Sequence, residues 1–356
     1  MKDLWTYIRE EHDKKRPVVL YGTGDGADKI YSKLRSDNVT VSGVFASDGF
    51  VRDRYYREMK VESFRAVMSR LKDPVVLVSF GTSRPEVIAA IDDIAAQAEV
   101  YAPDVPVCGG EIFDLAFYEK HREELDRVSS LLADELSRRC MENIILGKIS
   151  GKIPYLHAAE CTKEDIFSLT ETPEGAVYFD LGAYNGDTVK EYSSRYPSIS
   201  RIVAVEPEPH NQRKLNALKD DPSVKAELIT YRALISDSCH DSYISAAARG
   251  RGTRANPATE AKTILTPAMS IDRIAEETGL IPDLIKFDIE GSEIEGIRGA
   301  EAVIAAHRPM LRIAAYHRSA DLFEIAEAVL RIRSDYRIYM RHLPSIPAWD
   351  TDLIFV

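Results

Sequence analysis

The chain has 356 residues, of which 45% are hydrophobic and 29% are charged, and its formal net charge is −11 at pH 7. A chain of this length and composition can form two or three globular domains with sizeable cores. The acidic balance argues against nonspecific binding to nucleic acid or to an anionic membrane as the main role, although a local basic patch could still exist.

The four cysteines are scattered and include no C-x-x-C pair. This pattern gives little support to a zinc site or a disulfide framework and favours reduced thiols. No apolar run reaches the length of a membrane span, and the N-terminus lacks the apolar core of a signal peptide. We therefore expect a cytoplasmic protein.

Residues 1–110 are predicted to form a small Rossmann-like domain of the nucleotide-binding type. After a charged helix, a strand at 17–21 is followed by further strands at 39–45, 74–80 and 100–102, with helices between them. This alternation favours a parallel sheet covered by helices.

The turn after the first strand contains Gly22, Gly24 and Ala27 in the pattern G-x-G-x-x-A, and Asp48 follows at the distance of an acid that binds a dinucleotide ribose. One interpretation is a bound nucleotide or nucleotide sugar. The other is that the glycines only permit a tight turn in a structural domain. An NAD-dependent oxidoreductase built on this turn is a further alternative, weakened because we recognise no catalytic set to accompany it.

Residues 111–172 are predicted to be a mainly helical connector that packs between two domains. Apolar residues recur at helical spacing up to about residue 150, and Glu, Arg and Lys fill the other faces. His157 lies in the mixed segment that follows, where a structural or surface histidine is the favoured interpretation.

The stretch Val177–Thr188, V-Y-F-D-L-G-A-Y-N-G-D-T, has the pattern of a cofactor-binding loop. A buried strand is broken by Gly182 and Gly186, and a helical pattern follows. The glycines allow the backbone to approach a ligand closely, and the N–H groups of the turn and helix offer donors to it. In the spacing D-x-G-x-x-x-G, the carboxylate of Asp180 would repel a pyrophosphate but suits the methionine ammonium of S-adenosylmethionine.

Two later positions fit the rest of the same cofactor. Glu206 follows the next apolar strand, where an acid grips a ribose diol. Backbone groups near Ala233, after a third strand, would lie beside an adenine ring. Together these features predict a methyltransferase that uses S-adenosylmethionine.

Residues 236–262 are polar, glycine-rich and irregular, which is uncommon inside a compact domain unless the loop is functional or mobile. The loop contains Arg249, Arg251 and Arg254. One interpretation is a lid whose arginines meet an acidic or phosphorylated substrate. The other, slightly favoured, is a solvated loop.

Candidate catalytic residues follow the next two strands. Asp288 and Glu290 lie at the carboxyl end of the strand that begins at Leu284, and the strand at 310–315 leads to His317. Ligands of open α/β sheets bind beyond these strand ends. Asp288 or His317 could remove a proton from an acceptor hydroxyl, whereas His317 could equally hold the last hairpin. The two acids could also bind a divalent cation, but they lack an identified third ligand, so we predict no metal site.

Four motifs stand out within residues 111–356: F-D-L-G-A-Y-N-G-D-T at 179–188, I-K-F-D-I-E-G-S-E at 285–293, A-Y-H at 315–317 and R-H at 341–342. This combination resembles the FkbM-family methyltransferases. The resemblance implies a class I fold that binds S-adenosylmethionine, with a mostly parallel sheet and a reversed last strand. It also implies O-methylation, often of a sugar or secondary-metabolite hydroxyl.

The resemblance also implies roles for single residues. Those at the cofactor are Asp180, Gly182, Ala183 and Gly186 at the methionine part, Glu206 at the ribose, and Asp187 and Thr188 beside them. Asp288 would be the acid that faces the substrate, and we expect Glu290 and His342 to help position the acceptor.

The sequence therefore predicts an α/β protein with two Rossmann-like doubly wound domains, at 1–110 and 173–356, joined by the helical connector 111–172. The second domain would have the class I methyltransferase fold and transfer a methyl group to a hydroxyl of a sugar, glycan or secondary metabolite. A small metabolite or carboxylate is the alternative acceptor. A different class of alternative is a nucleotide-sugar-binding or scaffold protein with an inactive methyltransferase domain, and a homo-oligomer is compatible with either.

Overall fold

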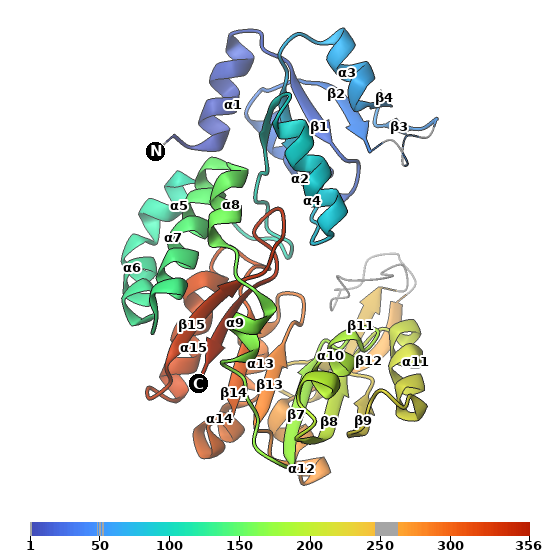
Figure 1. The fold of residues 1–356 in the computed structure, drawn as a ribbon, viewed down its shortest axis with the longest axis vertical. Coiled ribbons are helices and arrows are strands. Elements are labelled where there is room, and N and C mark those ends of the chain that lie inside the picture. Colours follow the sequence, from blue (N-terminus) through green and yellow to red (C-terminus); the bar gives the residue numbers. More distant parts are fainter. Residues whose placement is uncertain (1, 48, 50, 52, 246–262) are drawn as a thin grey trace. The chain divides into compact units, whose positions relative to one another are not determined.

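The computed structural model describes residues 2–47, 49, 51, 53–245 and 263–356, which form two compact units (Figure 1). Unit 1 consists of Met1–Ser130, Asp134–Thr162 and Met340–Thr351, and unit 2 of Leu131–Ala133, Lys163–Tyr339 and Asp352–Val356. This division differs from the three segments expected from the sequence, because unit 1 contains most of the expected connector and also residues 340–351.

Unit 1 contains a six-stranded sheet in the order β3-β4-β2-β1-β5-β6. Its strands are β1 (Val18–Tyr21), β2 (Val41–Ala46), β3 (Tyr55–Tyr56), β4 (Met59–Ser63), β5 (Val75–Val78) and β6 (Glu99–Tyr101), and its helices include α1 (Leu4–Asp13), α2 (Asp25–Ser36), α3 (Phe64–Arg70) and α4 (Pro85–Ala95). Neighbouring strands are parallel except in the pair β3–β4. The Rossmann-like sheet predicted from the sequence is confirmed, whereas the β3–β4 hairpin was not predicted.

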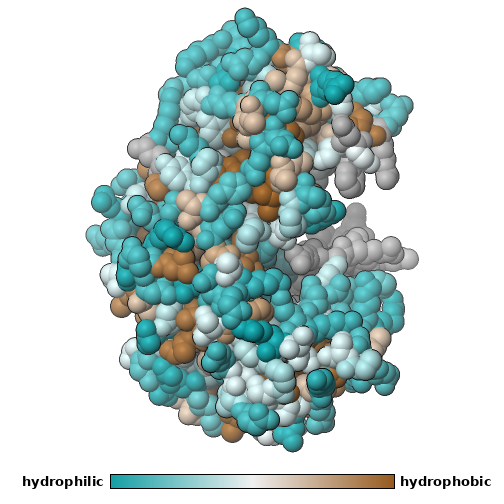
Figure 2. All heavy atoms as spheres, in the orientation of Figure 1, coloured by the Kyte–Doolittle hydropathy of each residue, from teal (hydrophilic) through white to brown (hydrophobic). Residues whose placement is uncertain are grey.

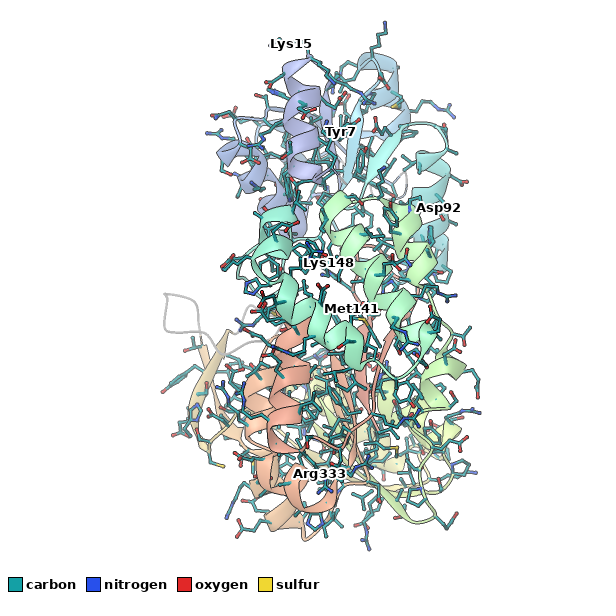
Figure 3. All side chains as sticks on the ribbon, turned by 90° about the vertical axis from the view of Figure 1, so that its left-hand side faces the viewer. Tyr7, Lys15, Asp92, Met141, Lys148 and Arg333 are labelled. Carbon is teal, nitrogen blue, oxygen red and sulfur yellow. The ribbon has the colours of Figure 1, made fainter. Side chains whose placement is uncertain are left out.

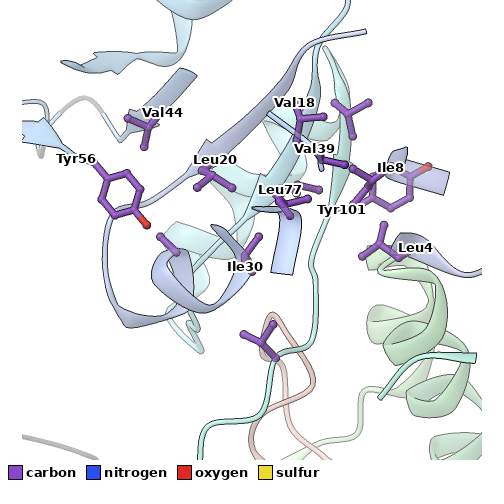
Figure 4. Close-up of a cluster of buried hydrophobic side chains, with 14 of the residues drawn as sticks. Leu4, Ile8, Val18, Leu20, Ile30, Val39, Val44, Tyr56, Leu77 and Tyr101 are labelled. Carbon is purple, nitrogen blue, oxygen red and sulfur yellow. The ribbon is translucent and has the colours of Figure 1, made fainter. Parts of the chain in front are cut away.

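Apolar residues from the strands and from two helices form the core of this sheet's domain (Figure 4). Leu20 and Leu77 come from the neighbouring strands β1 and β5, Ile30 comes from α2, and Ile8 comes from α1. Every residue of β1 and of β5 is buried. This burial on both faces explains why these strands are continuous apolar runs in the sequence.

Four further helices belong to unit 1: α5 (Leu115–Lys120), α6 (Arg122–Leu131, whose last residue is in unit 2), α7 (Glu135–Ser150) and α8 (Ile153–Ala159). The long helix α7 carries Met141 and Lys148 (Figure 3), and the buried Lys148 forms an ion pair with Asp104. Asp134 caps the start of α7 and accepts a 2.6 Å hydrogen bond from Arg341. Burial alone would raise the pKa of Asp134, but Arg341 and neighbouring donors lower it to about 2.

Unit 2 is built on a seven-stranded sheet in the order β15-β16-β14-β13-β7-β8-β9. The strands are β7 (Ala176–Leu181), β8 (Ile199–Val205), β9 (Glu227–Tyr231), β13 (Leu284–Phe287), β14 (Met310–Ala314), β15 (Ile338–His342, which continues into unit 1) and β16 (Thr351–Phe355). The helices are α9 (Lys163–Phe167), α10 (Asp187–Arg195), α11 (Pro209–Ala217), α12 (Ile271–Thr278), α13 (Glu293–Arg298), α14 (Glu301–His307) and α15 (Asp321–Ile332). The central pairs are parallel, and β16 is antiparallel to β14. The expected class I order with a reversed last strand is therefore confirmed.

A small third sheet has the order β10-β12-β11, formed by Leu234–Ile235, Thr263–Met269 and His240–Ser245. The strand predicted to begin at Thr263 is confirmed. The prediction that residues 236–262 are irregular was wrong for residues 240–245, because these form β11, which pairs with β12 along its whole length. Arg249, Arg251 and Arg254, which we considered as parts of a lid, lie outside the described residues.

The face seen in Figure 2 is mainly hydrophilic, with hydrophobic residues scattered among the polar ones, as expected of a chain with 29% charged residues. No helix within the described parts of the chain has both the length and the apolar character needed to cross a bilayer.

Candidate active site

The loop after β7 packs directly against the end of β13. Gly182 has a φ of +78°, and a Cβ at this position would lie 1.9 Å from the backbone oxygen of Asp288. The Asp288 N–H in turn donates to the carbonyl of Leu181 at 3.1 Å. Only glycine allows both this backbone conformation and this approach. The contact holds two of the predicted site segments together, at the carboxyl edge of the sheet.

Glu206 joins the same loop to the end of β8. Its carboxylate accepts a hydrogen bond from the Tyr184 N–H at 3.0 Å and another from the Glu208 N–H at 2.9 Å. Burial raises the pKa of Glu206 to about 7, against the effect of these donors. Each carboxylate oxygen has a further lone pair, so the side chain can still accept hydrogen bonds from a ligand diol.

Asp180 lies beneath the loop and is completely buried. One oxygen, Oδ2, accepts a hydrogen bond from the Thr188 hydroxyl at the start of α10. The other, Oδ1, has no hydrogen-bond partner among the described residues and lies 3.7 Å from Lys286 Nζ. Burial raises the pKa of Asp180, which Lys286 and Thr188 partly oppose. Direct contact of Asp180 with the methionine ammonium stays a prediction.

Lys286 is a buried cation that links two of the predicted acids. Its ammonium lies 3.7 Å from Asp180 Oδ1 and 3.6 Å from Asp288 Oδ2. Burial alone would lower the pKa of Lys286, but Asp288 and Asp180 raise it above its usual value. The lysine therefore remains charged and balances both carboxylates. Sequence reasoning missed it, although a lysine inside the apolar strand I-K-F-D was a usable signal.

Asp288 lies at the point where the ends of β13 and β14 meet. The Tyr316 hydroxyl donates to Asp288 Oδ1 at 3.2 Å, and His317 Nε2 lies 3.5 Å from the same oxygen. His317 Nε2 also lies 3.6 Å from Glu290 Oε2. The Asp288 side chain is 34% exposed and that of His317 only 1%. Asp288 can therefore touch a substrate, whereas His317 supports it from the interior.

The environment of His317 is acidic on both sides of the ring. Nδ1 lies 3.0 Å from Glu293 Oε1, at an ion-pair distance but without hydrogen-bond geometry. Burial alone would lower the pKa of His317, but Glu293, Asp288 and Glu290 raise it to about 9. Both ring nitrogens therefore carry a proton at neutral pH, and the ring cannot accept another.

The other residues predicted for the cofactor lie along the loop and near β10. Ala183 and Ala233 are buried, and Asp187 begins α10, where its side chain accepts from the Thr188 N–H at 2.9 Å. Gly186 has a φ of +83°, and a Cβ there would lie 2.2 Å from the Leu218 side chain. The roles of these residues toward the cofactor stay predictions.

His342 belongs to unit 1. It is fully buried, and its Nδ1 shares a 2.9 Å hydrogen bond with the Thr351 hydroxyl. Burial lowers the pKa of His342 to about 3, so the ring is neutral. These contacts give it a structural part in the hairpin, and positioning of the acceptor by His342 stays a prediction.

The glycine-rich turn of unit 1 has a packing explanation. A Cβ at Gly22, whose φ is +115°, would lie 2.7 Å from the Phe80 ring, and one at Gly26 would lie 2.5 Å from the backbone oxygen of Ser79. At Gly24 a Cβ would meet no described atom within 4 Å. Asp48 lies outside the described residues. The nucleotide or nucleotide sugar considered for this turn therefore stays a prediction without further support.

The spacing Tyr-x-x-x-Lys, found in one catalytic set of NAD-dependent oxidoreductases, does occur in the chain, at Tyr56 and Lys60. The two residues lie on the β3–β4 hairpin, where Tyr56 pairs with Met59 and not with Lys60. The Tyr56 hydroxyl donates to Asp28 at 2.9 Å, and Lys60 lies 3.2 Å from Asp53. On a hairpin this spacing does not bring the side chains together as it would on a helix.

The sheet order, the glycine loop after β7 and the acids beyond β8 and β13 are those of the class I methyltransferase fold. The family described as "Methyltransferase FkbM domain" matches residues 180–338. The chain therefore contains an FkbM methyltransferase domain over these residues. The family expected from the sequence is thus confirmed, and the chain is a methyltransferase whose cofactor is S-adenosylmethionine.

Among solved structures, the methyltransferase FkbM from Methylobacillus flagellatus is similar to this chain with a TM-score of 0.73 and 20% identity, over 100% of this chain and 94% of the other. This similarity extends to the fold of the whole chain. The precorrin-6y C5,15-methyltransferase from Geobacter metallireducens has a TM-score of 0.34 and 15% identity, over 54% and 86% of the two chains. No curated protein sequence matches the chain.

Proposed function

We propose that the chain is an O-methyltransferase that methylates a hydroxyl of a sugar, glycan or secondary metabolite, with Asp288 as the general base. The observation that carries this proposal is the position of Asp288. It combines 34% side-chain exposure with a buried cation, Lys286, at 3.6 Å and a tyrosine hydroxyl at 3.2 Å. A carboxylate that is fixed by neighbouring side chains but remains partly exposed is suited to accept a proton from a bound substrate.

When bound, S-adenosylmethionine supplies a methyl group on a sulfonium sulfur. A nucleophile that attacks the methyl carbon in line with the carbon–sulfur bond takes the methyl group, and the sulfur leaves as a thioether. A sugar hydroxyl is a weak nucleophile and needs its proton removed in the transition state. The Asp288 carboxylate would take that proton, while Lys286 and His317 balance its charge. Glu290, whose φ of +57° turns the chain at this point, would help to position the acceptor beside it.

For the cofactor, we propose that Glu206 accepts hydrogen bonds from the ribose hydroxyls and that the backbone of 182–186 faces the methionine part. Asp180 is completely buried, so its clearest contribution is to hold Thr188 and Lys286 in place. Asp187 and Thr188, at the N-terminal end of α10, would lie beside the cofactor. Ala233 would lie near the adenine.

The test is a methyl-transfer assay with an acceptor screen that begins with nucleotide sugars and free sugars. Asp288→Asn should lower kcat by about 10²- to 10⁴-fold without loss of S-adenosylhomocysteine affinity, which calorimetry measures. Asp220→Asn, at an exposed acid of the same unit, is the control and should keep full turnover.

Full turnover of Asp288→Asn would remove Asp288 from the role of base. The stability of the product to alkali distinguishes the two acceptor classes, because a methyl ether survives and a methyl ester of a carboxylate is hydrolysed. An alkali-labile product would replace the hydroxyl in this proposal by a carboxylate.

A further inference from the structure

Behind the candidate active site, three ionisable side chains meet in the interior of unit 2. Glu293 on α13, His317 after β14 and Asp321 at the start of α15 are each 1% exposed. One potential ligand atom from each residue lies within 4.8 Å of those of the other two. These residues are distinct from the pair Asp288 and Glu290, which we considered as metal ligands from the sequence.

Two atoms of this cluster have no hydrogen-bond partner among the described residues, namely Glu293 Oε2 and His317 Nδ1. Two of the remaining oxygens accept hydrogen bonds from nearby backbone, Glu293 Oε1 from the Ile289 N–H at 3.0 Å and Asp321 Oδ2 from the Arg318 N–H at 2.7 Å. A buried polar atom without a partner is costly, and a second carboxylate nearby adds repulsion. His317 Nδ1 at least faces Glu293 Oε1 at 3.0 Å, whereas no described residue offsets the burial of Glu293 Oε2, and this atom in particular indicates a missing ligand.

We propose that Glu293, His317 and Asp321 bind a divalent transition-metal cation of the Zn²⁺ or Mn²⁺ type, with His317 coordinating through Nδ1. On binding, the cation would replace the proton on His317 Nδ1, and the two carboxylates with the resulting neutral imidazole would carry a charge of −2, which the cation balances. An imidazole ligand favours these metals over Mg²⁺ and Ca²⁺, which prefer oxygen ligands. The 3.0 Å between His317 Nδ1 and Glu293 Oε1 matches the separation of neighbouring ligands at about 2.1 Å from a metal.

The cation would act on the candidate active site through the other side of the histidine ring. With Nδ1 on the metal, Nε2 carries the hydrogen and faces Asp288 Oδ1 at 3.5 Å and Glu290 Oε2 at 3.6 Å. Histidines that bind metals commonly donate their second N–H to a carboxylate in this way. The site is completely buried, so the cation would fix the ring that supports Asp288 and would not touch the acceptor.

The alternative occupant of the cluster is a proton on Nδ1 that pairs with Glu293. Metal analysis of the untagged full-length protein distinguishes the two. After removal of metals with a chelator, reloading with Zn²⁺ or Mn²⁺ and gel filtration, we expect one ion per chain and a higher melting temperature. Absence of a retained ion under these conditions would overturn the proposal.

The matched variants lie on one helix. Glu293→Gln should lower the affinity for the ion at least about tenfold in calorimetric titration, whereas Glu295→Gln, two residues along α13, should leave it unchanged. Equal affinities in the two variants would place the ion elsewhere and also refute the proposal. If Glu293→Gln fails to fold, X-ray absorption of the loaded native protein decides, since a shell without a nitrogen ligand contradicts coordination by His317.

This test is independent of the function proposed above. Loss of the ion from the native protein with intact methyl transfer would overturn only the metal site. Retention of the ion by a protein in which Asp288→Asn is fully active would overturn only the role of Asp288.

Discussion

At the scale of the residue, the acids of the candidate site were predictable and the groups that hold them were not. Asp180 lies near the end of an apolar strand, and Glu206 and Asp288 directly follow apolar strands. Parallel strands bring such positions to one edge of a sheet. Lys286 is different. It lies on β13, two residues before Asp288, but its other partner, Asp180, lies on the neighbouring strand β7. One sequence does not show which side chains meet across strands.

Glu206 allows a prediction about pH. Its pKa of about 7 means that the carboxyl is largely neutral at pH 6 and ionised at pH 8, and the ionised form is the stronger acceptor for ribose hydroxyls. The affinity for S-adenosylhomocysteine should therefore rise about tenfold from pH 6 to pH 8, as measured by calorimetry. Glu206→Gln should bind weakly at both values, with the slope abolished.

The control for this experiment is Glu227→Gln, at an exposed acid on β9, which should retain the slope of the native protein. A native affinity that does not change between pH 6 and pH 8 would contradict contact between Glu206 and the ribose.

At the scale of the element, the long apolar strands were predicted well and the short or interrupted elements were not. The sequence pattern of residues 292–306 predicts one helix, but the structure has two there, α13 and α14. The chain turns at Gly299, where a Cβ would lie 2.2 Å from the backbone oxygen of Ser236. This break is set by a contact with a distant segment, which helical periodicity cannot reveal. Strand β3 has only two residues, too few to show alternation.

The loop after β7 offers a test with a matched pair of glycines. Gly182 and Gly175 have almost the same φ, +78° and +79°, but a Cβ meets the Asp288 oxygen at Gly182 and no described atom within 4 Å at Gly175. Gly175→Ala should cost about 1–2 kcal/mol of unfolding free energy from backbone strain alone. Gly182→Ala should cost about 1–3 kcal/mol more and abolish S-adenosylhomocysteine binding.

Denaturant unfolding and calorimetry measure both effects. Equal losses of stability in the two variants would show that the approach of Gly182 to Asp288 does not constrain the loop.

At the scale of the whole molecule, the sequence order of the segments does not match the two units. Residues 340–351 belong to unit 1 although they follow nearly all of unit 2. Thr82 and Ile346 exchange backbone hydrogen bonds of 2.9 and 3.0 Å, and Trp349 packs on Gly81, where a Cβ would lie 2.0 Å from its ring. No local sequence pattern predicts these contacts, because they join positions far apart in the chain.

The fluorescence of a single tryptophan can report on the contact between Trp349 and Gly81. The chain has two tryptophans, so in a Trp5→Phe background the fluorescence comes from Trp349. Gly81→Ala should shift this emission to longer wavelength and lower the melting temperature by several degrees, about what 1–3 kcal/mol of overpacking predicts. Gly24→Ala, at an extended position where a Cβ meets no described atom, should leave both unchanged. Identical spectra for the two variants would contradict the packing of Trp349 on Gly81.

The late position of residues 340–351 has a consequence for biosynthesis. A ribosome adds about 5–20 residues per second, so roughly 10–40 seconds separate the synthesis of residue 162 from that of the segment that completes unit 1. Throughout that interval the nascent chain exposes the surface around Gly81 that Trp349 later covers. Assembly of unit 1 is therefore completed only after nearly all of unit 2 has been synthesised, and a chain that stops before Met340 lacks part of unit 1 even if its sheet has folded.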